Sequence, residues 1–264
     1  MAANDILCAT DFTPASDAAL KYAGMLARRT GAGITLLHLK ATGGHGPQEK
    51  QDAHNALALQ MDRCGVAELA LPLLAEGSVV QGIADHAAEG HSLLVIGTHG
   101  AKGLRQSLFG ADMLKVARRS AVPVLVVQEG SAVREPEQIV LPVAAHAGIE
   151  RLLDAVCVLA KAFTSEVHIY QLSRPNETVS EELLANKDRM IERLRNEGLR
   201  WESSLEPSTT FSIGFAGPTI EYAERVGGGL IAVMAHASDE YRYMADAEKE
   251  RLLMNPARIP VLFA

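Results

Sequence analysis

An internal repeat constrains this chain more than any other feature of its sequence. The stretch that begins at Ile6 aligns without a gap with the stretch that begins at Ile139, and the alignment continues until Leu39 meets Leu172. Few residues are identical, but each copy contains an apolar run, a loop, an amphipathic helical pattern and a second apolar run. The two stretches begin 133 residues apart (139 − 6), which is the length of a small domain. The 264 residues therefore predict two similar domains.

The ends of the two halves agree as well. SLLVIGTHG at 92–100 corresponds to GLIAVMAHA at 229–237, and PVLVV at 123–127 corresponds to PVLFA at 260–264. Loose spacing between such anchors is expected, because insertions fall in loops. The polar segment 128–138 contains a proline and is the natural linker.

Unbroken apolar runs alternate with helical patterns in both halves. Unbroken runs are typical of strands that are covered on both faces in a parallel sheet. We therefore expect two doubly wound parallel-sheet α/β domains in tandem, at 1–130 and 138–264. The expected strands of the first half lie near 5–10, 33–39, 70–75, 92–97 and 123–128, and its helices near 14–30, 47–64, 78–90 and 111–120. The expected strands of the second half lie near 138–143, 166–172, 199–205, 229–235 and 259–263.

The amino-acid composition argues against some classes of binding partner. Lys and Arg total 25 against 32 Asp and Glu, and aromatic residues make up only 5%, so nucleic acid is not an expected partner. No apolar run is long enough to cross a membrane, and the N-terminus lacks the regions of a signal peptide. Cys8, Cys64 and Cys157 form no CxxC pair, which fits a reducing compartment. We therefore expect a cytoplasmic protein without a membrane partner.

Residues that could bind a ligand follow the strands of the first half. In an open parallel sheet, ligands bind beyond the carboxyl ends of the strands, where the strand order reverses. Asp11 follows the first strand, and its carboxylate could accept a hydrogen bond from a base amine or a ribose hydroxyl. Gly97, Gly100 and Gly110 let the backbone approach a phosphate, and a helix N-terminus near residue 111 favours an anion. Taken alone, glycines near a turn more often serve the geometry of the backbone than a phosphate.

The combination of these segments resembles the universal stress protein family. The resemblance rests on ILCATDFTPASDAALKYAGMLA at 6–27, Glu76-Gly77, VIGTHG at 95–100, and the spacing Gly-x2-Gly-x9-Gly before PVLVV. It covers nearly all of residues 4–128 and recurs, weakened, over 138–264. It implies an adenine-nucleotide-hydrolase-like or flavodoxin-like fold and an adenine nucleotide site. It also implies that the last strands of the two halves pair as an internal pseudo-dimer, and that the chain forms a homodimer.

The resemblance assigns a set of nucleotide-binding positions. Contacts with adenine and ribose fall to Ala9, Thr10, Asp11, Leu39 and Ile96. Contacts with phosphate and ribose fall to Gly97, His99, Gly100, Gly110, Ala111 and Asp112. The resemblance implies no metal ligand and no required cofactor, with ATP or AMP as the nucleotide.

The match fails at the phosphate end. Ala111 stands where the family has Ser or Thr, so the hydroxyl that would donate to a phosphate is missing. Asp112 follows, and a carboxylate there would repel a polyphosphate by about 1–4 kcal/mol at ~4 Å. Lys102 and Arg105 could offset part of this repulsion. These departures favour weak binding of ATP, or binding of adenosine or AMP.

The second half departs further. Ala144 corresponds to Asp11, and Ala235-His236-Ala237-Ser238 corresponds to Gly97–Gly100, so the nucleotide motif is lost there. A domain that keeps its core pattern without the motif is expected to be a packing partner. His146 and His236 should lie at one sheet edge, where a metal or small-ligand site is the alternative to plain loop residues.

Three functions remain open from the sequence. The first is a stress-response regulator that senses an adenine nucleotide, and the second is a nucleotide-independent interaction or scaffold protein with the same fold. The third is an enzyme, at most a slow ATPase, for which His99 is the candidate base. No residue that would orient His99 is evident, so no catalytic residue is assigned.

Overall fold

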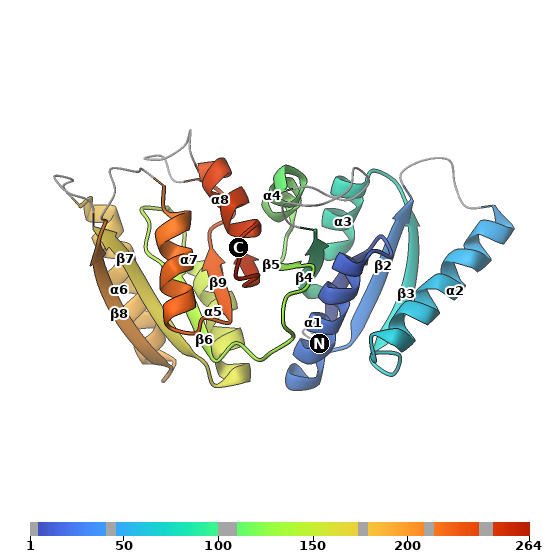
Figure 1. Cartoon of the computed structure of the whole chain (residues 1–264), viewed down its shortest axis with the longest axis horizontal. Coiled ribbons are helices and arrows are strands. Elements are labelled where there is room, and N and C mark those ends of the chain that lie inside the picture. Colours follow the sequence, from blue (N-terminus) through green and yellow to red (C-terminus); the bar gives the residue numbers. More distant parts are fainter. Residues whose placement is uncertain (1–4, 41–45, 100–109, 174–178, 209–213, 238–244) are drawn as a thin grey trace. The chain divides into compact units, whose positions relative to one another are not determined.

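The computed structural model describes all residues except 1–4, 41–45, 100–109, 174–178, 209–213 and 238–244 (Figure 1). The chain divides into two compact units, Met1–Arg134 and Glu135–Ala264. Among the described residues, no helix is long and apolar enough to cross a membrane.

The first unit contains a parallel sheet with the strand order β3-β2-β1-β4-β5 (Figure 1). The chain moves outward from β1 to β3 and then crosses back to β4 and β5. Because such crossovers are right-handed, α1 and α2 cover one face of the sheet and α3 and α4 cover the other. The elements are β1 (Asp5–Thr10), α1 (Pro14–Thr30), β2 (Ile34–Lys40), α2 (Pro47–Arg63), β3 (Ala70–Glu76), α3 (Val79–Ala87), β4 (His91–Thr98), α4 (Gly110–Arg119) and β5 (Val124–Gln128).

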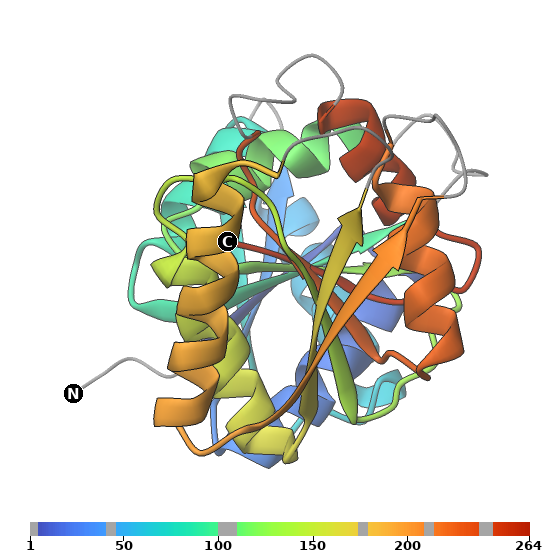
Figure 2. The ribbon, with the colours of Figure 1, turned by 90° about the vertical axis from the view of Figure 1, so that its left-hand side faces the viewer.

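The second unit repeats this order as β8-β7-β6-β9-β10, again with parallel pairs. Figure 2 shows α6 in gold and α7 in orange on opposite faces of the sheet, with β7 and β8 between them. The elements are β6 (Gln138–Pro142), α5 (Glu150–Phe163), β7 (Glu166–Ser173), α6 (Glu181–Asn196), β8 (Arg200–Pro207), α7 (Ala216–Arg225), β9 (Leu230–Val233), α8 (Ala245–Leu253) and β10 (Val261–Phe263).

The expected fold class, two doubly wound parallel-sheet α/β domains in tandem, is confirmed by these strand orders. The largest difference is in α3, which ends at Ala87 and not at the expected residue 90, and β9 and β10 are also shorter than the apolar runs that predict them. Pro260 immediately precedes β10 and cannot donate a backbone hydrogen bond to a sheet. The pairing of the last strands of the two halves stays a prediction.

Local signals fix both ends of α1. Thr13 is the N-cap, and its side chain accepts a hydrogen bond from the backbone N–H of Ser16. Pro14 follows at the first helical position, where its missing N–H costs nothing. Gly31 ends the helix in the left-handed conformation with φ 73°. The sequence therefore determines where α1 begins, at the carboxyl end of β1.

Close contact between α1 and β4 depends on Gly97. A Cβ atom at this position would lie 2.2 Å from the carbonyl oxygen of Ala15 and 2.7 Å from the backbone nitrogen of Ser16. Both neighbours are backbone atoms, so no change of rotamer could relieve the overlap. Gly97 is therefore needed for packing, whatever else it does.

The outermost strand of the first unit, β3, is more exposed than the strands inside the sheet. Ala70 is buried, the residues after it are exposed or partly exposed, and the Leu71 side chain is largely exposed. Pro72 lies in the middle of this strand and pairs in register with Leu36 of β2. Proline in a sheet is confined to such edge positions, which agrees with the outermost place of β3.

We predict that Gly97→Ala lowers the free energy of unfolding by about 1–3 kcal/mol, because α1 must move away from β4 to admit the methyl group. Gly217→Ala in the first turn of α7 is the control, since a Cβ there makes an ordinary contact with the end of the Arg251 side chain at 3.5 Å. It should not lower stability, because alanine favours a helix more than glycine does. Urea unfolding of the two variants measures the difference, and equal effects would contradict the packing role of Gly97.

Candidate functional site

The carboxyl ends of β1 and β4 lie side by side where the strand order of the first unit reverses. Ala9 pairs with Ile96, and Thr10 pairs with His38 of β2. Ala9 and Ile96 are almost fully buried, so a ligand at this edge could reach them mainly through their backbone. Leu39 also directs its side chain inward, since a Cβ at Gly82 of α3 would lie 3.0 Å from its Cδ2.

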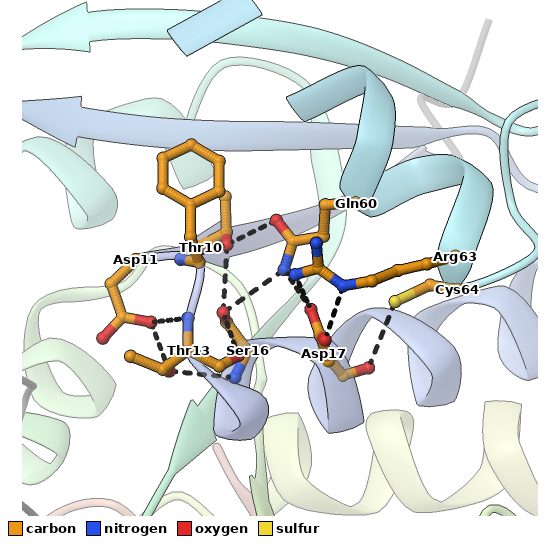
Figure 3. A network of polar contacts seen from close by, with 9 residues as sticks. Thr10, Asp11, Thr13, Ser16, Asp17, Gln60, Arg63 and Cys64 are labelled. Carbon is orange, nitrogen blue, oxygen red and sulfur yellow. Dashed lines mark hydrogen bonds and ion pairs between the residues drawn. The ribbon is translucent and has the colours of Figure 1, made fainter. Parts of the chain in front are cut away.

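Asp11 is exposed and is held in a tight turn at this edge (Figure 3). Its Oδ1 accepts hydrogen bonds from the Thr13 backbone N–H at 3.2 Å and from the Thr13 hydroxyl at 2.5 Å. Its other oxygen points away from the turn in Figure 3, and it has no partner among the described residues. One oxygen therefore fixes the carboxylate, and the second remains an acceptor for a ligand.

The Thr10 side chain turns away from the ligand edge. Its hydroxyl donates a 2.7 Å hydrogen bond to Oε1 of Gln60, and it accepts one from the Phe12 N–H at 3.0 Å. The Thr10 carbonyl oxygen lies 3.0 Å from Nδ1 of His38, and a carbonyl can only accept, so this nitrogen carries the proton. Thr10 thus shapes the site chiefly as a structural residue.

Gln60 is completely buried and joins α2 to the start of α1 (Figure 3). Its amide nitrogen donates to Oδ1 of Asp17 at 2.7 Å and lies 3.3 Å from the Ser16 hydroxyl. The Thr10 hydroxyl and the Asp17 carboxylate together fix the orientation of the amide. No sequence pattern indicates this role, because a lone glutamine in an amphipathic helix belongs to no motif.

Arg63 completes this network from the surface. It binds Asp17 with both ends of its guanidinium fork, from Nε to Oδ2 at 2.8 Å and from Nη2 to Oδ1 at 2.7 Å. Partial burial raises the pKa of the Asp17 carboxyl, but the hydrogen bonds from Arg63 and Gln60 outweigh it and hold the pKa below its usual range. Asp17 is therefore an ion-paired structural residue.

Phe12 forms the bend between β1 and α1. It has a positive φ of 65°, which a bulky residue rarely adopts, and its ring packs on His38 with centroids 4.4 Å apart. Backbone strain of this kind is concentrated at functional sites. The bend places Asp11 at the carboxyl end of β1, where β4 is the neighbouring strand.

His99 has an orienting partner, contrary to the expectation from the sequence. Its Nδ1 lies 2.8 Å from Oε2 of Glu129, and only 15% of its side chain is exposed. The register explains the contact, because Thr98 pairs with Gln128 and the next residues of β4 and β5 are neighbours. Glu129 follows His99 by thirty positions, so only the pairing of the strands brings them together.

Only some of the residues predicted to contact phosphate lie among those that the structure describes. Gly100, Lys102 and Arg105 lie outside the described residues. Gly110 is the first residue of α4, and Ala111 follows it in the first turn, so the N-terminus of this helix does lie where the sequence places it. Asp112 forms an exposed ion pair with Lys115, from Oδ1 to Nζ at 2.9 Å. Part of the negative charge expected to repel phosphate is thus already offset.

The two histidines of the second unit differ in environment. His146 is largely buried, and burial together with the positive charges of Lys249 and His236 lowers its pKa to about 4. His236 is exposed. Asp239 and Glu240 lie outside the described residues, and the described part of the chain holds no group of three metal-ligating side chains.

Comparison with known proteins identifies the family. The profile of the universal stress protein family matches residues 3–128. The second unit repeats the strand order of the first. The chain belongs to the universal stress protein family, as a member with two such domains in tandem.

Solved structures resemble the whole chain. A universal stress protein from Archaeoglobus fulgidus DSM 4304 has a TM-score of 0.74 and 18% identity, with 100% of this chain and 99% of that one covered. A putative universal stress protein from Pseudomonas aeruginosa UCBPP-PA14 has a TM-score of 0.60 and 19% identity, with 98% and 92% covered. A universal stress protein solved in complex with cAMP aligns with 49% of this chain and 100% of its own, at 23% identity and a TM-score of 0.42. No curated protein matches this chain.

We predict that Gln60→Leu lowers the free energy of unfolding by about 1–3 kcal/mol, because the buried Thr10 hydroxyl loses the nearer of its two acceptors, Gln60 and Ser16, and Asp17 loses a donor. Gln51→Leu on the same helix is the control, since Gln51 is exposed and its amide donates to Asn55 at the surface. Thermal or urea unfolding measures both variants. A Gln60→Leu protein as stable as the control would show that the network does not hold α2 against α1.

Proposed function

We propose that this protein is a cytoplasmic stress-response regulator whose first domain binds an adenine nucleotide, ATP or AMP, weakly. The observation that carries the proposal is the Asp11 carboxylate. Its Oδ1 is held by Thr13, while its other oxygen lacks a partner among the described residues, at the edge where the strand order reverses. Such an acceptor suits a base amine or a ribose hydroxyl. Cys8, Cys64 and Cys157 are buried free thiols, which fits a reducing cytoplasm.

The negative charge in the first turn of α4 supports a preference of the site for nucleotides with few phosphate groups. The helix N-terminus favours an anion, but Asp112 places a carboxylate in the same turn. Lys115 offsets this charge only partly, because the pair is exposed and screened by water. The cost to a ligand grows with its phosphate charge. We therefore expect AMP to lose less affinity than ATP.

We predict that Asp112→Asn increases affinity for ATP by about tenfold and leaves adenosine binding unchanged, because only the phosphates approach this carboxylate. Calorimetric titration of nucleotide-free protein with ATP, AMP and adenosine measures all three affinities. An equal gain for adenosine would show that Asp112 acts through the fold rather than through phosphate repulsion.

We predict that Asp11→Asn weakens binding of ATP, AMP and adenosine alike, by about tenfold. The asparagine oxygen can still accept from Thr13, so the turn is kept, but an amide nitrogen replaces the second acceptor. If wild-type protein gives no heat with any of these ligands up to millimolar concentration, the nucleotide proposal is wrong. The nucleotide-independent interaction or scaffold function then becomes the better reading.

A second candidate function, slow hydrolysis of the bound nucleotide, is favoured by the His99–Glu129 pair. A carboxylate that binds one ring nitrogen holds the imidazole in one orientation, as a general base requires. The missing hydroxyl at Ala111 still weighs against efficient phosphate chemistry. Binding without turnover therefore remains the first proposal.

A further inference from the structure

The second domain contains a cavity of about 140 Å³ at the carboxyl edge of its sheet. Residues that follow β6 and residues at the end of β7 contribute to its lining, together with residues of α5 and α6. Most of the lining is apolar and includes Val143, Ile149, Leu152, Leu183, Met190 and Val233. An engineered apolar cavity of about 150 Å³ stays dry and binds benzene. The volume therefore suits a ligand with one small ring or a short branched chain.

Two apolar residues of this lining stand where the first domain has hydroxyl groups. The Thr10 and Ser16 hydroxyls lie 3.0 Å apart, in the buried hydrogen-bond network at the end of β1. The gapless alignment of the two halves puts Val143 at the position of Thr10 and Ile149 at the position of Ser16. Both of these residues line the cavity. The second domain therefore has apolar surface where the first domain has a hydrogen-bonded network.

The titratable residues of the lining do not call for a charged ligand. The Lys249 ammonium donates to the carbonyl oxygens of Ala235 and His236, and Lys249 makes a further interaction within the chain. Burial, together with the positive charges of Lys249 and His236, lowers the pKa of His146 to about 4, so this imidazole is neutral at pH 7. No acidic side chain is among the described lining residues. Because a charge is costly to bury without a partner, these surroundings favour an uncharged ligand.

A buried amide holds the segment that follows β6 in place. Asn186 of α6 has no exposed surface, and its Nδ2 donates to the carbonyl oxygens of Ala144 and His146, both at 2.8 Å. These hydrogen bonds satisfy two backbone acceptors in the wall of the cavity, and a collapse of the wall inward would break them. The cavity is therefore preformed, as ligand sites usually are.

We propose that this cavity binds a small uncharged apolar molecule, with a single ring or a short branched chain of about six to eight non-hydrogen atoms. The site lies where the strand order of the second domain reverses, which is where this type of sheet binds its ligands. The volume is too small for a nucleotide, and Ala144 lines the cavity where the first domain has the acceptor Asp11. The inference concerns the second domain and does not depend on nucleotide binding by the first.

Toluene and benzoate form the test pair, because they share one ring and differ in charge. Titration of the full chain with each, followed through its methyl NMR resonances, is expected to show submillimolar binding of toluene and at least tenfold weaker binding of benzoate. Benzoate binding as tight as that of toluene would overturn the uncharged ligand class. The absence of any shift with toluene up to its solubility in water would overturn the site itself.

Two kinds of variant test the cavity. Ala144→Leu should occupy part of its volume and weaken toluene binding at least tenfold, whereas Ala185→Leu, at an exposed position of α6, should leave it within twofold of wild type. Val143→Thr keeps the size of the side chain but restores the hydroxyl that Thr10 has in the first domain, so it should weaken toluene at least threefold. Unchanged toluene affinity in Ala144→Leu would overturn the proposal. If Ala144→Leu fails to fold, unchanged affinity in Val143→Thr would overturn it instead.

The same resonances separate this site from the first domain. Toluene should shift the methyl resonances of Ile149 and Leu183 and leave those of Leu39 and Ile96 unchanged. Asp11→Asn should leave toluene affinity within twofold of wild type. Loss of toluene binding in Asp11→Asn, or shifts at Leu39 and Ile96 alone, would place the ligand in the first domain and overturn the proposal.

Discussion

The site of the first domain depends on how closely α1 approaches β4. The carbonyl of Ala15 occupies the space that a side chain at position 97 would need, so the helix N-terminus and the end of β4 touch through backbone alone. This contact fixes the distance between the turn at Asp11 and the residues after β4. The buried amide of Gln60 then holds α2 against the same helix end. One packing constraint and one hydrogen-bond network thus position the carboxyl edge of β1 and β4 before any ligand is considered.

The sequence determines the elements well because each carries a local signal. Thr13, Pro14 and Gly31 mark the ends of α1, and unbroken apolar runs mark the central strands. The ends of short strands are harder to predict, since β10 covers only the last three residues of the run 259–263 that predicts it. Neighbouring residues determine helix capping, whereas the length of a strand also depends on the distant strand with which it pairs.

The candidate site is less predictable because its contacts join distant segments. Glu129 meets His99 only through the register of β4 and β5, and Gln60 meets Thr10 only through the packing of α2. Neither residue belongs to a motif. In the second domain, the loss of the nucleotide motif suggests a domain without a ligand site. Lys249 and Gln171 nevertheless line a cavity at the carboxyl edge of its sheet. A motif search detects a lost ligand class but cannot detect a different one.

The proline in β3 has a consequence for how copies of this chain meet. Leu69 and Gly77 both use their backbone groups to bond with β2, so alternation along the strand turns the backbone of Pro72 to the open side. A foreign strand that tried to extend the sheet there would find no donor at the centre of the edge. Leu71 can therefore remain exposed on this strand without making it a template for aggregation. Pro72 therefore disfavours extension of the sheet at the outer strand of the first domain.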